Sequence, residues 1–206
     1  MGDLKGLYVI TDEQLTPKQT LLSQVKTALN AGAKIVQLRD KSSQDYEIKE
    51  LSLKLKKICD QYGALFIMND RIALAKEVDA SGVHIGKEDI SLHKARAILG
   101  EEKIIGVSCY GDITLAKQME REGADYVAFG ACFASTTKKA APTIDLNILS
   151  QAKSQLSIPI CAIGGINHSN ISKVAAHGVD MISVVKSVFQ NDAISDNVQK
   201  LIENMS

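Results

Sequence analysis

Short apolar runs rich in β-branched residues alternate with helical patterns along this chain from residue 6 onward. The alternation is typical of parallel βαβ units, because two parallel strands must be joined by a crossover that is usually a helix. About eight such units can be counted. The expected strands are Leu7 to Ile10, Ile35 to Leu38, Leu65 to Met68, Gly82 to Ile85, Ile104 to Val107, Tyr126 to Phe129, Ile160 to Ile163 and Met181 to Val184.

Eight units in one chain favour a closed (β/α)8 TIM barrel over an open doubly wound sheet. Such barrels usually have about 250 residues and can be built from about 200, so the 206 residues of this chain are sufficient. No linker, low-complexity segment or second-domain boundary interrupts the pattern. We therefore expect an α/β protein with a single compact domain over residues 1–206.

The charge balance excludes several classes of partner. Lys and Arg together number 24, and so do Asp and Glu, so no net field attracts nucleic acid or an anionic membrane.

The segment MGDLKGLYVITDE has no basic stretch followed by an apolar signal core, and no apolar run approaches the roughly 20 residues that span a bilayer. We expect a cytoplasmic protein whose widely spaced cysteines are reduced thiols. The cysteines are Cys59, Cys109, Cys132 and Cys161.

Two carboxylates follow neighbouring expected strands. In a (β/α)8 barrel the active site lies at the C-terminal ends of the strands. Asp70 follows FIMN in the third unit, and Asp89 follows GVHIGKE in the fourth. Adjacent strands lie about 4.8 Å apart, so the two carboxylates could share one hard cation such as Mg²⁺. Each residue alone could instead cap the following helix, but their pairing favours the metal site.

Cationic side chains follow the second expected strand, which ends VQLRDK. Because side chains alternate along a strand, Gln37 and Arg39 point to one face, and Lys41 follows in the loop. A guanidinium and an ammonium close together suit a phosphate or a diphosphate. The alternative is an arginine in a structural ion pair beside a solvated lysine. Ser108, at the end of the fifth strand, would reach the same rim as a ligand contact or as a helix cap.

Two further segments could hold an anion. The loop after the sixth strand offers hydroxyl and ammonium donors, although it could also be ordinary surface. Glycine after the seventh strand lets backbone N–H groups approach a ligand, and a short helix near residue 185 would add its positive end. That combination is often the phosphate site of such barrels. The residues concerned are Ser135, Thr136, Thr137, Lys138, Gly165, Val185 and Lys186.

Two anion sites on one rim indicate two phosphorylated reactants. A diphosphate held by a metal and by cations would be a leaving group, because those charges neutralise the charge that builds up as its bond breaks. The sequence therefore indicates a transfer reaction. His84, within the fourth strand, is expected to be a structural histidine, since a leaving-group mechanism does not require a catalytic base.

Seven motifs occur in the order and approximate spacing of the thiamine-phosphate synthase family, which this chain resembles from Tyr8 to about Val188. The resemblance implies a (β/α)8 barrel that joins hydroxymethylpyrimidine diphosphate to a thiazole phosphate, or to its carboxylated form, with Mg²⁺ as cofactor. The products would be thiamine phosphate and diphosphate, formed by a dissociative mechanism. The motifs are YVITD, VQLRDK, FIMNDR, GVHIGKED, IIGVS, DYVAFGACFASTTK and AIGGI.

The same resemblance implies residue roles. The implied catalytic positions are Arg39, Lys41, Ser108 and Lys138, and the implied metal ligands are Asp70 and Asp89. The implied substrate-binding positions are Gln37, Leu38, Arg39, Asp40, Lys41, Asn69, Ser108, Ser135, Thr136, Thr137, Lys138, Gly165, Val185 and Lys186. The partners would be two phosphorylated small molecules, without nucleic acid or membrane, and assembly into a homo-oligomer is left open.

The chain departs from the commonest family pattern at a few positions, none of which removes an implied metal ligand or diphosphate cation. Lys87 stands in place of a glutamine, and Lys186 in place of a serine whose backbone N–H is the implied contact. The other departures are Ala131 and Ala134 for prolines and Ser135 for a threonine.

Two other functions fit parts of the pattern. A thiazole tautomerase of the same superfamily would bind a thiazole phosphate and needs no Mg²⁺–diphosphate site, so the retention of Asp70, Asp89, Lys41 and Lys138 argues against it. A non-catalytic sensor of phosphorylated ligands would require an output module, and no segment of that kind is recognised beside the barrel.

Overall fold

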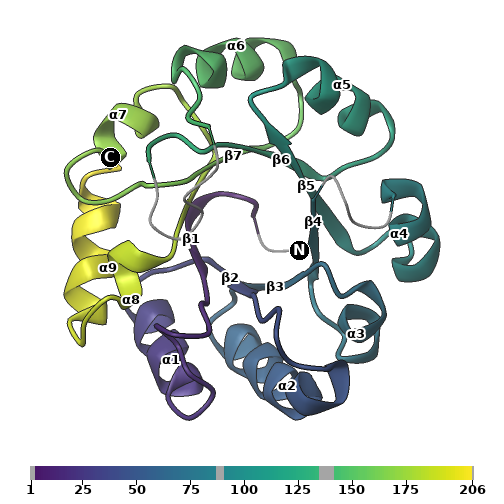
Figure 1. Cartoon of the computed structure of the whole chain (residues 1–206), viewed down its shortest axis with the longest axis vertical. Helices are drawn as coiled ribbons and strands as arrows, with labels where there is room; N and C mark the ends of the chain where they lie inside the picture. Colours follow the sequence, from purple (N-terminus) through teal and green to yellow (C-terminus); the bar gives the residue numbers. More distant parts are fainter. Residues whose placement is uncertain (1–2, 87–90, 135–141, 206) are drawn as a thin grey trace.

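The computed structural model describes residues 3–86, 91–134 and 142–205, and its strands form a closed parallel barrel in the order β1 to β8. Helices surround the strands in Figure 1, which looks along the barrel. The expected (β/α)8 fold is confirmed. The strands are β1 (Gly6–Ile10), β2 (Ile35–Leu38), β3 (Leu65–Asn69), β4 (Gly82–Ile85), β5 (Ile104–Tyr110), β6 (Tyr126–Phe129), β7 (Ile160–Ile163) and β8 (Met181–Val184). The helices are α1 (Leu21–Asn30), α2 (Asp45–Gln61), α3 (Ile72–Glu77), α4 (Leu92–Leu99), α5 (Ile113–Arg121), α6 (Asn147–Gln155), α7 (Ile171–Ala175), α8 (Lys186–Phe189) and α9 (Ile194–Glu203).

The observed strands agree closely with the expected ones. β2, β4, β6, β7 and β8 have the predicted bounds, and β1 and β3 are each one residue longer. β5 continues to Tyr110, beyond its predicted end, because its register with β6 shifts between Ser108 and Tyr110. Such a bulge is a property of strand pairing, so the local sequence pattern does not reveal it.

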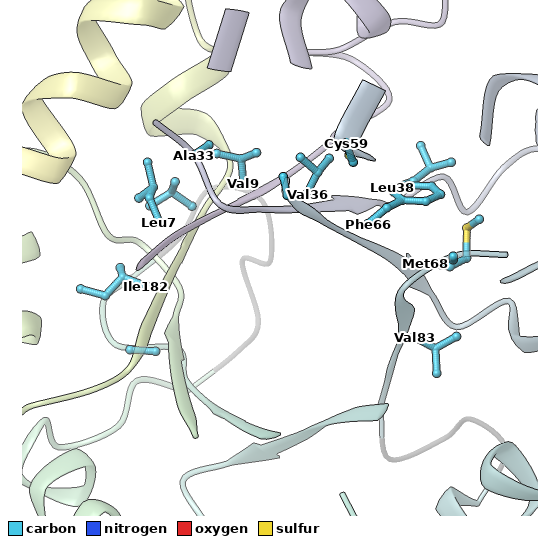
Figure 2. Packing of buried hydrophobic residues seen from close by; sticks show 14 of the residues in the cluster. Leu7, Val9, Ala33, Val36, Leu38, Cys59, Phe66, Met68, Val83 and Ile182 are labelled. Atoms are coloured by element: carbon cyan, nitrogen blue, oxygen red, sulfur yellow. The ribbon is translucent and has the colours of Figure 1, made fainter. Parts of the chain in front are cut away.

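The strands separate two apolar cores, because successive side chains point to opposite faces. Outward-facing residues pack against the helices, and Figure 2 shows Val9, Val36 and Val83 on this outer side of the strands. Inward-facing side chains fill the barrel, which is therefore a packed core and not a pore. The interior residues are Tyr8, Ile10, Ile35, Leu65, Ile67, Ile104, Tyr126, Ala128, Cys161 and Met181.

The helices cover the barrel with one apolar side each. α2 buries Ile48, Leu55 and Cys59, and α9 packs against α1 where the last unit meets the first. No helix in the part of the chain that the structure describes is long and apolar enough to cross a membrane.

All four cysteines are buried and unpaired, as expected for reduced thiols. Burial raises the pKa of the Cys132 thiol to about 11 and the pKa values of Cys59 and Cys109 to about 12. Burial in the barrel interior also raises the pKa of Cys161. Because the thiolate is the reactive form, these side chains are inert near neutral pH.

We expect the folded protein at pH 8 to react with a small thiol reagent at least about 10²-fold more slowly than the unfolded chain, because the raised pKa values leave little thiolate. Stopped-flow absorbance with a chromogenic disulfide reagent measures both rates. Unfolding in guanidinium should release all four thiols. A thiol that reacts in the native state at the rate of an unfolded one would show that the barrel wall opens at that residue.

Candidate active site

A cavity of about 930 Å³ opens at the C-terminal ends of the strands, and every strand contributes to its wall. This is the face that carries the active site in (β/α)8 enzymes, and the volume is large enough for a ligand of drug size or more. The sequence-predicted site residues that line the cavity are Gln37, Arg39, Lys41, Asn69, Asp70, Ser108, Gly165, Val185 and Lys186.

The remaining predicted residues do not line this cavity or cannot be placed in it. Leu38 is 2% exposed and packs in the outer core between the strands and the helices (Figure 2). Asp40 accepts hydrogen bonds from Ser43 and Ser42 and so closes its own loop. A substrate contact by Leu38 or Asp40 would therefore have to come from the backbone. Outside the described residues lie Asp89, Ser135, Thr136, Thr137 and Lys138, and with them the departure at Lys87.

Asp70 lies at the end of β3 in a left-handed conformation, with φ of 62°. Its backbone N–H donates to the carbonyl of His84 (3.0 Å), which ties it to β4 as the neighbouring strand. Its carboxylate accepts a hydrogen bond from the Asn69 amide (2.5 Å) and lies 3.3 Å from the Lys41 ammonium. The N-cap residue of α3 is Arg71, so Asp70 does not occupy the capping position that the sequence left open as an alternative. Strained backbone of this kind is concentrated at functional sites.

Arg39 and Lys41, which follow β2, are both held by hydrogen bonds from their backbone N–H groups. The Arg39 N–H donates to the Thr11 hydroxyl (3.0 Å), and the Lys41 N–H donates to the Glu13 carboxylate (2.8 Å). Among the described residues, the Arg39 guanidinium has no ion-pair or hydrogen-bond partner, although it lines the cavity. The alternative of an arginine held in a structural ion pair is therefore not seen in the described structure. An uncompensated guanidinium of this kind suits an anionic ligand.

A chain of hydrogen-bonded side chains crosses the barrel beneath the cations. The Gln37 amide donates to the Tyr8 hydroxyl (2.6 Å), which lies 3.2 Å from the Tyr126 hydroxyl. The Tyr126 hydroxyl lies 2.9 Å from His84 Nδ1, and His84 Nε2 lies 2.8 Å from the Ser108 hydroxyl. Burial raises the pKa of both tyrosines well above the ordinary value, so both hydroxyls stay protonated. Both ring nitrogens of His84 are hydrogen-bonded, as expected for a structural histidine.

Gly106 makes room for this chain. It faces Tyr126 across the β5–β6 pair, and a Cβ atom at Gly106 would lie 2.0 Å from Tyr126 Cζ. The Tyr126 ring also stacks on the His84 ring, with centroids 5.6 Å apart. The absent side chain on β5 thus lets an aromatic ring enter the barrel and carry a hydroxyl to its centre.

The loops after β6 and β7 form the opposite wall. Cys132 N–H donates to the Ile163 carbonyl (2.9 Å), and Phe133 N–H donates to the Gly164 carbonyl (3.0 Å). Gly165 has φ of +65°, and a Cβ atom there would lie 2.6 Å from the carbonyl oxygens of Phe133 and Ala134. Only glycine fits this approach, so the backbone itself is what the loop presents to the cavity.

Two buried polar atoms at this end of the cavity have no hydrogen-bond partner in the described structure: Ser183 Oγ and His168 Nδ1. Ser183, on β8, is 2% exposed. Helix α8 begins just beyond it at Lys186, after the N-cap residue Val185, as the sequence predicts. Buried polar atoms without partners are rare, so this end of the cavity is suited to a polar ligand.

Comparison with known proteins agrees with this geometry. A family model described as thiamine monophosphate synthase matches residues 7–188. The chain belongs to the thiamine monophosphate synthase family. The matched range contains all eight strands except the first residue of β1, and it includes every implied site residue.

Individual relatives extend the match to nearly the whole chain. A thiamine-phosphate synthase of Thioalkalivibrio sulfidiphilus is 44% identical over 186 residues, which cover 90% of this chain and 88% of that protein. One of Alcanivorax borkumensis is 43% identical over 201 residues, covering 96% and 93%. A solved thiamine phosphate pyrophosphorylase of Pyrococcus furiosus has a TM-score of 0.89 and 35% identity, covering 98% of this chain and 96% of that one. These matches confirm the predicted family and enzyme class, a transferase of thiamine biosynthesis.

Some residues at the site of this thiamine monophosphate synthase family member are not singled out by its sequence. Tyr8 and Tyr126 are read as strand residues, and Ser183 as part of an apolar run. One signal was present: a tyrosine at an inward-facing strand position needs a partner for its hydroxyl. The partners themselves come from strands far away in the chain, so no local pattern names them.

We expect Tyr126→Phe to lower the free energy of unfolding by about 1–3 kcal/mol, because it removes a fully buried hydroxyl that contacts the half-buried His84 Nδ1 and the buried Tyr8 hydroxyl. Guanidinium denaturation followed by circular dichroism measures the change. The matched control is Tyr46→Phe, since Tyr46 is 80% exposed and should show almost no loss. Equal stability of the two variants would contradict a structural role for the interior chain.

Proposed function

We propose that this protein joins hydroxymethylpyrimidine diphosphate to a thiazole phosphate, 4-methyl-5-(2-phosphooxyethyl)thiazole, to give thiamine phosphate and diphosphate. With the carboxylated form of the thiazole phosphate, the same joining step is followed by loss of the carboxyl group as CO₂. One observation carries the proposal: a single cavity has two polar ends. Arg39 and Lys41 follow β2 at one end, and the other end, at β7 and β8, has glycine backbone and two buried polar atoms without a hydrogen-bond partner in the described structure. Such a cavity could bind the phosphate groups of two reactants at opposite ends, so that their rings meet in the middle.

The β2 end suits the diphosphate. Arg39 offers a forked donor set, and Lys41, which lines the same cavity, adds a second positive charge. As the bond between the methylene carbon and the diphosphate oxygen breaks, both bonding electrons leave with the oxygen. Fixed cations stabilise this developing charge more than they stabilise the bound substrate, and that difference lowers the barrier.

The floor of the cavity suits the aminopyrimidine. In the described structure Gln37 lines the cavity and its amide N–H₂ group donates to Tyr8, while its oxygen accepts no hydrogen bond from a described residue. An amide oxygen in that place is an acceptor for an exocyclic amine. The electron-rich ring would stabilise the methylene cation left after diphosphate departs. The thiazole nitrogen then donates its lone pair to that carbon, and with the uncarboxylated thiazole phosphate no proton transfer is needed. The carboxylated form would in addition lose CO₂ and take up one proton from water.

Magnesium is part of the proposal. In the described residues, no group of three or more His, Cys, Asp or Glu side chains gathers that could hold a metal. Mg²⁺ keeps several waters and uses one or two carboxylates together with substrate phosphates, so the Asp70 carboxylate at the cavity suits it. Asp70 would be one ligand, and the predicted second ligand, Asp89, lies outside the described residues. When bound, the ion would supply charge neutralisation on the diphosphate.

The β7–β8 end suits the thiazole phosphate. Gly165 presents backbone groups, and Val185 and Lys186 begin α8 beside them. Lys186 lines the same cavity, so its ammonium would add to the backbone contacts. The cytoplasmic location stays a prediction.

The decisive experiment gives purified protein both phosphorylated substrates and follows diphosphate release and thiamine phosphate by mass, first with Mg²⁺ and then with a chelator. We expect product only with the metal. Isomerisation of the carboxylated thiazole phosphate alone, without diphosphate release, would replace the proposal with the tautomerase. Ligand binding without any conversion would replace it with the sensor.

We expect Asp70→Asn to lower turnover about 10²- to 10³-fold, because it removes a negative charge from the proposed metal site. Asparagine tolerates the left-handed backbone of residue 70, so the barrel should keep its fold. The control is Asp60→Asn, which removes a carboxylate that is paired with Lys56 on the surface of α2. If Asp70→Asn keeps wild-type Mg²⁺-dependent turnover, Asp70 is not a metal ligand.

A further inference from the structure

The Arg71 guanidinium clamps the loop that joins β2 to α2. Its Nη2 group donates to the carbonyls of Asp40 (2.7 Å) and Ser43 (2.5 Å), and its Nε group donates to the Asp40 carbonyl (3.2 Å). Its Nη1 group pairs with the Asp45 carboxylate at the start of α2. The Arg71 side chain is only 18% exposed. One side chain therefore fixes the loop at three points.

Lys41 lies inside this clamped loop. The carbonyl of the preceding residue, Asp40, is held by Arg71, and the Lys41 N–H is held by Glu13. The Asp40 carboxylate accepts hydrogen bonds from Ser43, which closes the same turn. Partial burial raises the pKa of this carboxyl, but the hydrogen bonds from Ser43 and Ser42 and the charge of Lys18 together outweigh it, and the net pKa lies below the ordinary value. The carboxylate thus stays charged and keeps the turn closed at neutral pH.

The clamp comes from the same turn as the candidate metal ligand. Arg71 directly follows Asp70, and the Arg71 N–H donates to the Asn69 carbonyl (2.7 Å). The Lys41 side chain is 57% exposed, so by itself its ammonium would sample many positions. With both backbones joined through Arg71, that ammonium lies 3.3 Å from Asp70.

We propose that Arg71 is a positioning residue for diphosphate binding, which sets Lys41 beside Asp70 without touching the substrate. Arg71 does not line the described cavity, whereas Lys41 and Asp70 do. The inference rests on the proposed function, because it takes Lys41 to bind the diphosphate. It adds a residue whose effect on the substrate passes through the loop.

The contacts require arginine and not only a positive charge. The planar guanidinium reaches the two carbonyls and the Asp45 carboxylate at the same time, because its donors point along fixed directions. A lysine ammonium carries its donors on one atom and cannot span these acceptors. Arg71→Lys therefore keeps the charge and removes the clamp.

Arg96 provides a matched control at a distance from the rim. Its Nη1 group donates to the Gly100 carbonyl (3.1 Å), and its Nη2 group donates to the Gly123 carbonyl (3.0 Å) and to the Asp125 carboxylate (2.7 Å). The Arg96 side chain is 14% exposed, close to the value for Arg71. Arg96→Lys should thus disturb the fold to a similar degree while leaving the cavity intact.

The test is calorimetric titration of inorganic diphosphate with Mg²⁺ into the wild-type protein and its variants. We expect Arg71→Lys to weaken binding about tenfold and Arg96→Lys to leave it unchanged. In a Lys41→Ala background, Arg71→Lys should add almost no further loss, because it acts through Lys41. If Arg71→Lys does not fold, Asp45→Asn removes one contact of the clamp and should weaken binding about two- to threefold.

Three results would overturn the inference. Arg71→Lys and Arg96→Lys could weaken binding equally, which would indicate a general effect on the fold. Arg71→Lys could weaken binding as much in the Lys41→Ala background as in the wild type, which would show independent action. Wild-type protein that binds no diphosphate at all would overturn the proposed function, and the inference with it.

Discussion

The backbone pairing of β8 with β1, from Gly6 opposite Met181 to Val9 opposite Val184, closes the sheet on itself. In an open sheet of the same order, the ends of β2 and β8 would lie six strand spacings apart, or about 29 Å. In the barrel only β1 separates them, which reduces the path along the wall to about 10 Å. Closure therefore lets Arg39 and Lys186 line one cavity. The rim can act as one site only because this backbone pairing brings its side chains together.

The barrel interior is built in two parts with different demands. Toward the N-terminal ends of the strands, Ile35, Leu65 and Ile104 fill it with apolar volume. Above them, tyrosine, histidine and glutamine side chains satisfy one another through hydrogen bonds. A buried polar network is stabilising only when its members are paired, and here each of these side chains is hydrogen-bonded to another. This polar layer also borders the cavity, because Tyr8, Gln37 and His84 line its wall.

The sequence predicted the parts of this structure that depend on neighbouring residues. Strand bounds follow from local apolar runs, and the arrival of Arg39, Asn69, Asp70 and Ser108 at the rim follows from strand alternation and from counting to the strand ends. It did not predict parts that depend on distant partners. The bulge in β5 is set by β6, and the clamp of Arg71 closes on a loop 28 to 31 residues earlier. Whether Leu38 faces the cavity was decided by packing against the helices.

The space that Gly106 leaves for Tyr126 links two positions on adjacent strands. Any side chain at residue 106 collides with the ring unless residue 126 becomes smaller, and a smaller residue 126 alone leaves a void at the centre of the barrel. Either single substitution therefore lowers the stability of the barrel, and only a double substitution keeps both the space and the packing. The volume of the barrel interior at this level is therefore a property of the pair and not of either residue, and we expect a tolerated change at one position to require a compensating change at the other.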